Sequence, residues 1–144
     1  MYKHILLPTD GSELSLRAVR GAVEMASRLG AKIVGITVIE PYAYASLSEY
    51  RPETIADYEQ RADAVARERL AAVSRIAAEK NVPLETTVVR SFSPFESIIE
   101  AVKRFGCDAI FMASHGRRGL SAVLLGSETH KVLTHSSVPV MVYR

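Results

Sequence analysis

The chain has 144 residues, of which 48% are apolar and 24% charged, and its formal net charge is +2. This balance is typical of one globular domain, and a chain of this length buries about 70% of its unfolded surface without disulfides. No apolar run reaches the roughly 18 residues of a membrane-spanning helix, and so small a net charge argues against a nucleic-acid surface. Cys107 is the only cysteine, which fits a reducing compartment, and we interpret it as a core residue. We expect one cytoplasmic domain over residues 1–144.

The first part of the chain predicts a strand, a helix and a second strand. The apolar run from Lys3 to Pro8 is followed by Thr9-Asp-Gly-Ser12, a cluster of turn and N-cap residues. Over residues 13–29 apolar side chains recur at threes and fours, and Gly30 then stops the helix, whose buried face is expected to hold Leu16, Val19, Val23, Ala26 and Leu29. The β-branched run Lys32–Ile39 predicts a strand covered on both faces.

A long charged helix and an edge strand are predicted next. From Glu53 to about Asn81 one apolar stripe is interrupted only by Arg69, and it consists of Ile55, Tyr58, Ala62, Val65, Ala72 and Ile76. The other charged side chains are expected on a solvated outer face. The run Leu84–Arg90 alternates more than the other strands, which indicates a half-exposed edge of the sheet.

The last third of the chain repeats the alternation of helix and strand. Ser93-Pro-Phe-Glu96 combines an N-cap serine, a proline at the first helical position and a capping-box glutamate, which predicts a helix start. The short apolar run Ala109–Ala113 predicts a fully buried strand. A helix near Ser127–His135 and a final strand, Val138–Tyr143, follow it.

This order of elements predicts an α/β fold. Strands that alternate with helices form right-handed crossovers, and therefore a single-domain parallel sheet of about five strands with helices on both faces. Ligands of such sheets bind beyond the carboxyl ends of the strands, where the winding direction switches. We expect the switch between the first and fourth strands, so the turns at Pro8–Asp10 and Met112–Gly116 should converge on one crevice.

The stretch from Met112 to Thr129 has the features of a phosphate-binding loop. Gly116 follows the buried strand and Gly126-Ser127 precedes a helix, whose free N–H groups and positive dipole end attract phosphate. From Phe111 onward Glu128 is the only acidic residue, against four basic ones, Arg117, Arg118, Lys131 and Arg144. An ordinary strand-to-helix turn with solvated charges is the alternative, because the Gly-x-x-x-x-Gly-Lys-Ser/Thr loop and the Gly-x-Gly-x-x-Gly fingerprint are both absent.

Three pieces of the sequence resemble the universal stress protein family, in its ATP-binding branch. They are Ile5-Leu-Leu-Pro-Thr-Asp-Gly-Ser12, Val38-Ile-Glu-Pro41, and Ser114-His-Gly-x9-Gly126-Ser127 followed by Val138-Pro-Val. The resemblance covers essentially the whole chain. It implies a Rossmann-like fold of the adenine nucleotide alpha hydrolase type, with strand order 3-2-1-4-5, and a homodimer that forms through the last strand.

The resemblance also implies which residues hold ATP. The family binds ATP phosphates with a Gly-x2-Gly-x9-Gly-Ser/Thr motif, and in this sequence Ala113 occupies the position of the first glycine. Because alanine is the smallest substitute for glycine, we expect weakened or unchanged ATP binding. Pro8, Thr9 and Asp10 are expected by the adenosine, with Asp10 accepting a ribose hydroxyl hydrogen bond, and Val38 against the adenine. The other residues implied in cofactor binding are Met112 and, around the phosphates, Ala113, His115, Gly116, Arg117, Gly126, Ser127, Glu128 and Thr129.

The sequence predicts no metal site built from protein ligands, because the four histidines lack the His-Glu-x-x-His spacing. A Mg²⁺ ion that bridges bound phosphates is compatible with this pattern, since Mg²⁺ keeps several waters and takes few protein ligands.

Three functions fit these observations. The first is a cytoplasmic ATP-binding stress-response protein that acts as a dimeric regulatory module. The second is a slow ATPase or autophosphorylating protein, for which we expect no efficient catalysis, because the candidate bases Asp10 and His115 have no orienting partner in the sequence. The third is a nucleotide-free structural dimer. The apolar final strand favours a dimer in each case, because a second chain would cover its exposed edge.

Overall fold

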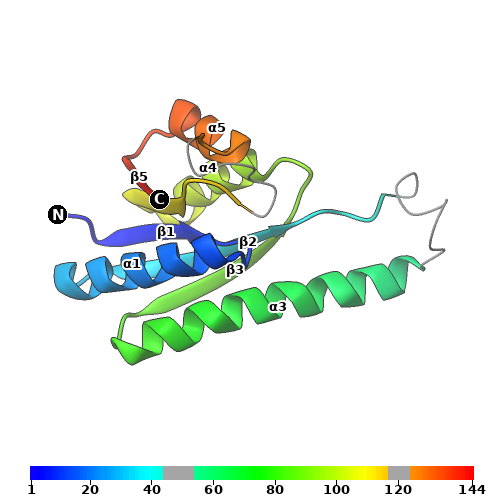
Figure 1. Cartoon of the computed structure of the whole chain (residues 1–144), viewed down its shortest axis with the longest axis horizontal. Coiled ribbons are helices and arrows are strands. Elements are labelled where there is room, and N and C mark those ends of the chain that lie inside the picture. Colours follow the sequence, from blue (N-terminus) through cyan, green and yellow to red (C-terminus); the bar gives the residue numbers. More distant parts are fainter. Residues whose placement is uncertain (44–53, 117–123) are drawn as a thin grey trace.

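The computed structural model describes residues 1–43, 54–116 and 124–144, which form a five-stranded parallel sheet in the order β3-β2-β1-β4-β5. The strands are β1 (His4–Pro8), β2 (Lys32–Ile39), β3 (Leu84–Arg90), β4 (Ala109–Ala113) and β5 (Val140–Tyr143). The helices are α1 (Glu13–Leu29), α3 (Ile55–Glu79), α4 (Pro94–Phe105) and α5 (Ser127–His135). Helices α1 and α3 cover one face of the sheet, and α4 and α5 cover the other (Figure 1). The predicted fold class and strand order are confirmed.

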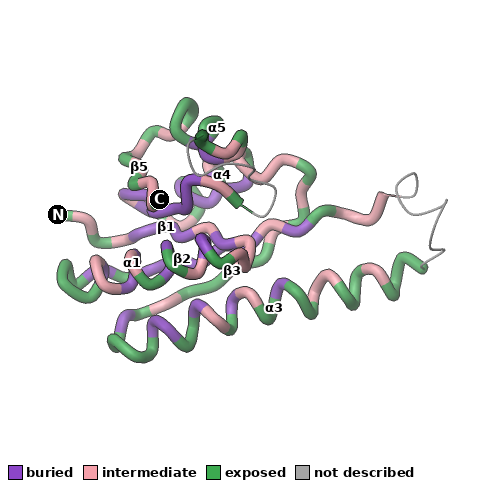
Figure 2. Tube along the Cα trace, in the orientation of Figure 1, coloured by how far each residue is buried: buried purple, intermediate pink, exposed green. Residues whose placement is uncertain are grey.

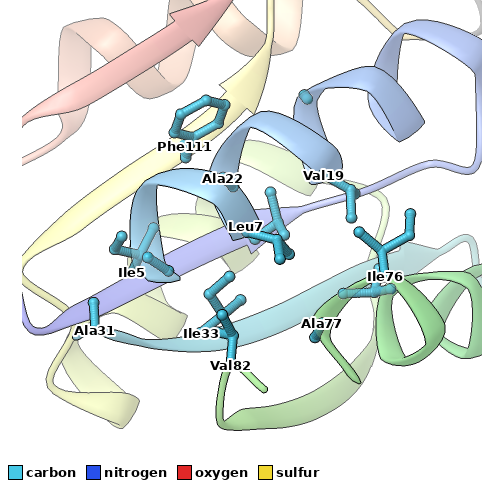
Figure 3. Close-up of a cluster of buried hydrophobic side chains, with 14 of the residues drawn as sticks. Ile5, Leu7, Val19, Ala22, Ala31, Ile33, Ile76, Ala77, Val82 and Phe111 are labelled. Atoms are coloured by element: carbon cyan, nitrogen blue, oxygen red, sulfur yellow. The ribbon is translucent and has the colours of Figure 1, made fainter. Parts of the chain in front are cut away.

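Successive side chains of each central strand enter different hydrophobic cores, because the side chains of a strand alternate between its faces. Ile5 and Leu7 of β1 pack with α1 and α3, whereas Leu6 between them packs with α4 and α5. Figure 3 shows the first of these cores, in which Val19 of α1 and Ile76 of α3 lie over the sheet. Both faces of β1 are therefore buried, as its continuous apolar sequence predicts.

The boundaries of α1 and β2 are the predicted ones. The Ser12 side chain caps α1 by accepting a hydrogen bond from the Ser15 N–H at 3.2 Å, and Gly30 ends the helix with a positive φ of 65°. The buried face differs in part from the predicted one. Leu29 is 42% exposed and Leu16 half-buried, because the helix turns Leu14, Ala18, Val19, Ala22, Val23 and Ala26 toward the sheet.

The apolar stripe predicted for α3 is only partly buried: Tyr58, Ala62 and Ala72 are half-buried. Ile76 is buried, but Ile55 is 56% and Val65 37% exposed. The residues that α3 turns to the core belong to a neighbouring stripe: Ala66, Leu70, Val73, Ile76 and Ala77. Figure 2 shows that the buried positions lie toward the C-terminal end of the helix. Tyr58, Ala62 and Val65 of the predicted stripe instead line a cavity, which the sequence pattern cannot distinguish from a core.

Helix α4 starts where predicted, but its capping and the start of β5 differ from the predictions. Pro94 is the first residue of α4, but Ser93 makes no side-chain capping bond, so the predicted capping box is absent. The Phe95 N–H that a cap would satisfy donates to Glu128 of α5 at 2.9 Å. Strand β5 begins at Val140 and not at Val138, whose N–H donates to the Ser136 hydroxyl at 3.1 Å.

Candidate functional site

Buried hydrogen bonds attach the turn after β1 to β2 and to α1. The Thr9 N–H donates to the Ile36 carbonyl of β2 at 2.9 Å, and the Thr9 hydroxyl lies 2.7 Å from the Ser15 hydroxyl of α1. The Asp10 carboxylate accepts the Ser12 N–H at 3.0 Å through one oxygen. The Thr9 side chain is therefore buried and hydrogen-bonded in the protein interior, and both Thr9 and Asp10 line the cavity described below.

The turn after β4 is tied to β5 and to α5. Met112, Ala113 and Ser114 are buried, and the Ser114 N–H donates to the Tyr143 carbonyl at 2.7 Å. The Thr129 hydroxyl of α5 donates to the Ala113 carbonyl at 3.0 Å. This buried contact joins the strand end to the first turn of the helix.

Helix α5 begins at a glycine because there is no room for a side chain. A Cβ atom at Gly126 would lie 3.0 Å from the His115 Cα and 3.3 Å from the Ser114 carbonyl oxygen, which accepts the Gly126 N–H at 2.8 Å. The first helical hydrogen bond runs from the His130 N–H to the Gly126 carbonyl. The N–H groups of the first turn, at Ser127, Glu128 and Thr129, have no acceptor within the helix and favour an anion.

The turns after β1 and β4 converge, as the switch-point argument predicts. A Cβ atom at Gly116 would overlap the second carboxylate oxygen of Asp10. Two segments more than 100 residues apart in the chain thus meet through a glycine that leaves space for a carboxylate.

Together these turns line a cavity of about 590 Å³, a volume within the range of small-molecule sites. Arg117 lies outside the described residues. Every other residue implied in cofactor binding lines the cavity: Pro8, Thr9, Asp10, Val38, Met112, Ala113, His115, Gly116, Gly126, Ser127, Glu128 and Thr129. The structure therefore brings the predicted residues into one site.

Sequence reasoning missed the wall of the cavity that α3 provides. This wall consists of Tyr58, Arg61, Ala62, Val65 and Arg69, and Phe92 and Pro94 lie at the same cavity after β3. The signal was present in the sequence, because Arg69 interrupts an otherwise apolar stripe. Its guanidinium Nη1 donates to the Thr37 hydroxyl at 3.2 Å, and the Tyr58 hydroxyl donates to the Glu40 carbonyl at 2.9 Å.

The carboxylate of Glu128, one of the charged groups of the site, already has a hydrogen-bond partner and an ion-pair partner. Glu128, expected near the phosphates, accepts the Phe95 N–H at 2.9 Å and pairs with Lys131 at 3.4 Å. No group of three or more metal-ligating side chains occurs within the part of the chain that the structure describes.

Cys107 lies outside this site and is 6% exposed. Burial raises the pKa of its thiol to about 11, so the thiolate is scarce at neutral pH. Its interpretation as a core residue is confirmed.

Among the described helices, none has the length and apolar character to cross a bilayer.

Comparison with known proteins identifies the family of this chain. The model of the universal stress protein family matches residues 1–144. Universal stress protein MJ0531 of Methanocaldococcus jannaschii is 30% identical over all of this chain and 83% of its own length, and universal stress protein YxiE of Bacillus subtilis is 30% identical over the full length of both.

Solved structures agree with the sequence comparison. The structure of protein MJ0577 superposes with a TM-score of 0.83 and 26% identity, over 99% of this chain and 96% of that one. A universal stress protein in complex with cAMP (TM-score 0.69, 23% identity, 99% and 97% coverage) shares the fold. So does one from Archaeoglobus fulgidus in complex with dAMP (TM-score 0.66, 19% identity, 99% and 98% coverage). With its whole length matched and its sheet order reproduced, this chain belongs to the universal stress protein family.

Proposed function

We propose that this chain is a cytoplasmic ATP-binding protein of the stress response, which acts as a dimeric binding or regulatory module. One observation carries the proposal: the Asp10 carboxylate and the first turn of α5, whose N–H groups have no acceptor within the helix, line one cavity, of about 590 Å³, at the switch point of the sheet. An acceptor for sugar hydroxyls and donors for phosphates are the two polar features that a nucleotide needs. The relatives solved with cAMP and dAMP support an adenine base.

In this proposal the two ends of the cavity bind different parts of the ligand. Pro8, Asp10 and Val38 contact the nucleoside, and the main chain of 126–129 binds the phosphates. Ala113 does not oppose the proposal, because it is buried in β4 and its carbonyl is bonded to Thr129. Ala113 belongs to the core cluster on the α1 and α3 side of the sheet, and it also lines the cavity.

A Mg²⁺ ion fits the site as a partner of the phosphates. Asp10 uses one carboxylate oxygen for the Ser12 N–H, while Glu128 is engaged with α4 and Lys131. Among the described residues that line the cavity, Asp10, Glu40 and Glu128 are the carboxylates, and so small a number matches the preference of Mg²⁺ for phosphate and water ligands in nucleotide sites.

The dimer is proposed to form through Val138–Tyr143. Strand β5 is an edge of the sheet, and Met141 in its middle is 46% exposed. An open apolar edge invites pairing with another strand, and a second copy of the same strand would satisfy it.

The test is to purify the protein without added nucleotide, denature it, and identify any released nucleotide by chromatography. Gly126→Asp places a negative charge at the phosphate seat, and Gln60→Asp adds the same charge on the exposed side of α3 as the matched control. We expect near-stoichiometric ATP from the wild type and from Gln60→Asp, but none from Gly126→Asp. Release of ADP would favour the slow ATPase. Absence of both, with no rise in melting temperature when ATP is added, would leave the nucleotide-free dimer.

A further inference from the structure

The α3 wall of the cavity is held to the sheet by polar contacts. In the N-terminal half of α3 the side chains are exposed or half-buried, and Ala66 is the first buried residue of the helix. The contacts from Arg69 to Thr37 and from Tyr58 to Glu40 end on either side of Val38, one residue before it in β2 and two residues after it, just beyond the strand. The wall is therefore attached to the strand that, in the proposed function, contacts the base.

The contact of Arg69 continues through a chain of buried hydroxyl groups. Thr37 is 1% exposed, and its hydroxyl accepts from Arg69 at 3.2 Å and donates to the Thr9 carbonyl at 2.8 Å. Since a hydroxyl carries one donor and two acceptor sites, both bonds are made at once. The Thr9 hydroxyl then meets that of Ser15 at 2.7 Å. Four elements, α3, β2, the end of β1 and α1, are joined in one polar chain.

This series of hydrogen bonds includes Thr9, the residue that precedes Asp10 in the turn after β1. The Thr9 hydroxyl also accepts the Gly11 N–H at 3.2 Å, so the residues on both sides of Asp10 are fixed to buried groups. A hydrogen bond from a charged donor to a buried acceptor is stronger than a neutral one, and its loss leaves polar groups unsatisfied. Arg69 is thus placed to fix both the α3 wall and the Asp10 turn through the single hydroxyl of Thr37.

We propose that Arg69, acting through Thr37, is a positioning residue for the nucleoside end of the cavity, so that it determines how much more tightly the site holds a nucleotide than a bare polyphosphate. The inference rests on the proposed function and extends it to a residue outside the family motif. Among the described residues, no hydrogen bond links Thr9, Ser15 or Thr37 to the phosphate end at 126–129, so the affinity of that end should be independent of Thr37.

The experiment measures the dissociation constants of ATP and of inorganic tripolyphosphate by calorimetry, on protein freed of nucleotide. Thr37→Val keeps the shape of the side chain but removes the hydroxyl, and Thr37→Ser is the matched control that keeps it. We expect Thr37→Val to lower the ratio of ATP affinity to tripolyphosphate affinity about tenfold, which corresponds to one hydrogen bond of a charged donor. Thr37→Ser should stay within about threefold of the wild type, and tripolyphosphate affinity should not change in either variant.

Arg69→Met and the double variant Thr37→Val with Arg69→Met test whether the two residues act as one unit. If Arg69 works through Thr37, the double variant lowers the ratio no further than the more affected single variant does. Should Thr37→Val prove unstable, Arg69→Lys gives a second measurement that retains the charge, and it too should lower the ratio because the guanidinium fork is lost.

Three results would overturn the inference: an unchanged ratio in Thr37→Val, equal losses for both ligands, or additive losses in the double variant. Wild-type protein that binds tripolyphosphate as tightly as ATP would overturn it as well. Failure of the proposed function is a separate result, because the wild type would then bind neither ligand.

Discussion

The carboxylate of Glu128, in the first turn of α5, accepts a hydrogen bond from the backbone N–H of Phe95, in the first turn of α4, at 2.9 Å. The two helix starts are therefore joined, and both line the candidate site, through Pro94 and through Ser127, Glu128 and Thr129. A carboxylate beside two helix N-termini is favoured by both dipoles. In this position Glu128 replaces the side-chain cap that Ser93 does not make.

Loss of this cap should destabilise the protein. We expect Glu128→Ala to lower the free energy of unfolding by about 1 kcal/mol, the usual cost of removing a helix cap. Glu128→Gln, whose amide oxygen can still accept the Phe95 N–H, should lose about half as much. Urea denaturation measures both. Lys131→Ala is the control, because its ion pair with Glu128 is exposed and should contribute little; a larger loss in that variant would contradict this account.

We expect alanine substitution at the two glycines of the site to lower the affinity for ATP, and the same substitution at a glycine in the core to leave it unchanged. Gly116→Ala displaces the Asp10 carboxylate and Gly126→Ala crowds His115, so each should lower ATP affinity by about tenfold, the equivalent of one displaced polar contact. Gly35→Ala is the matched control, because its Cβ would meet Val73 at an ordinary 3.5 Å. Calorimetric titration with ATP compares the three, and equal affinities would show that the close approaches are not needed.

Stability should fall in mild acid because of His4. Burial, followed by the positive charge of Lys32, lowers the pKa of His4 below the ordinary value of 6.5, against the opposing effect of Asp108. As the pH falls below 6.5, His4 becomes protonated in the unfolded chain before it does so in the folded protein. The free energy of unfolding is therefore highest above pH 6.5 and decreases as the pH falls toward the folded pKa. Unfolding by urea between pH 8 and pH 5 should show this slope, and His4→Gln should reduce it. An identical slope in the variant would assign the effect to other groups.

Cys107 should be unreactive in the folded protein. With a pKa of about 11 and 6% exposure, the thiol is both protonated and covered. We expect alkylation by iodoacetamide at pH 8 to be at least about a hundredfold slower in native protein than in urea. Mass spectrometry over time measures the two rates, and rapid native labelling would place the thiol on an accessible surface.

The proposed dimer should depend on the edge strand β5. Met141→Lys places a charge in the middle of this edge, where lysine opposes strand pairing. Sedimentation velocity should show the wild type as a dimer and the variant as a monomer. Val88→Lys on β3, the opposite edge, is the control, because Val88 is 42% exposed there. If Val88→Lys dissociates the protein and Met141→Lys does not, the dimer forms through the other edge.

Local sequence determined most of the fold. The periodicity and end signals of α1, the β-branched run of β2 and the short apolar run of β4 each predicted an element with the observed bounds. These signals act between near neighbours, so they are readable in one dimension. The alternation of strands and helices then restricted the topology, and the convergence of the two turns followed from the geometry of parallel sheets.

Tertiary structure decided what the apolar side chains and the caps would contact. On α3 two neighbouring stripes are equally helical in period, and only the position of the helix over the sheet assigned Val73 to the core and Val65 to the cavity. At Ser93 the capping pattern was complete, yet Glu128, 33 residues after Phe95, supplies the acceptor for the Phe95 N–H. Such contacts join residues far apart in the chain, and no local pattern contains them. For the same reason the roles of Arg69 and Thr37 could be inferred only once α3 and β2 had been placed side by side.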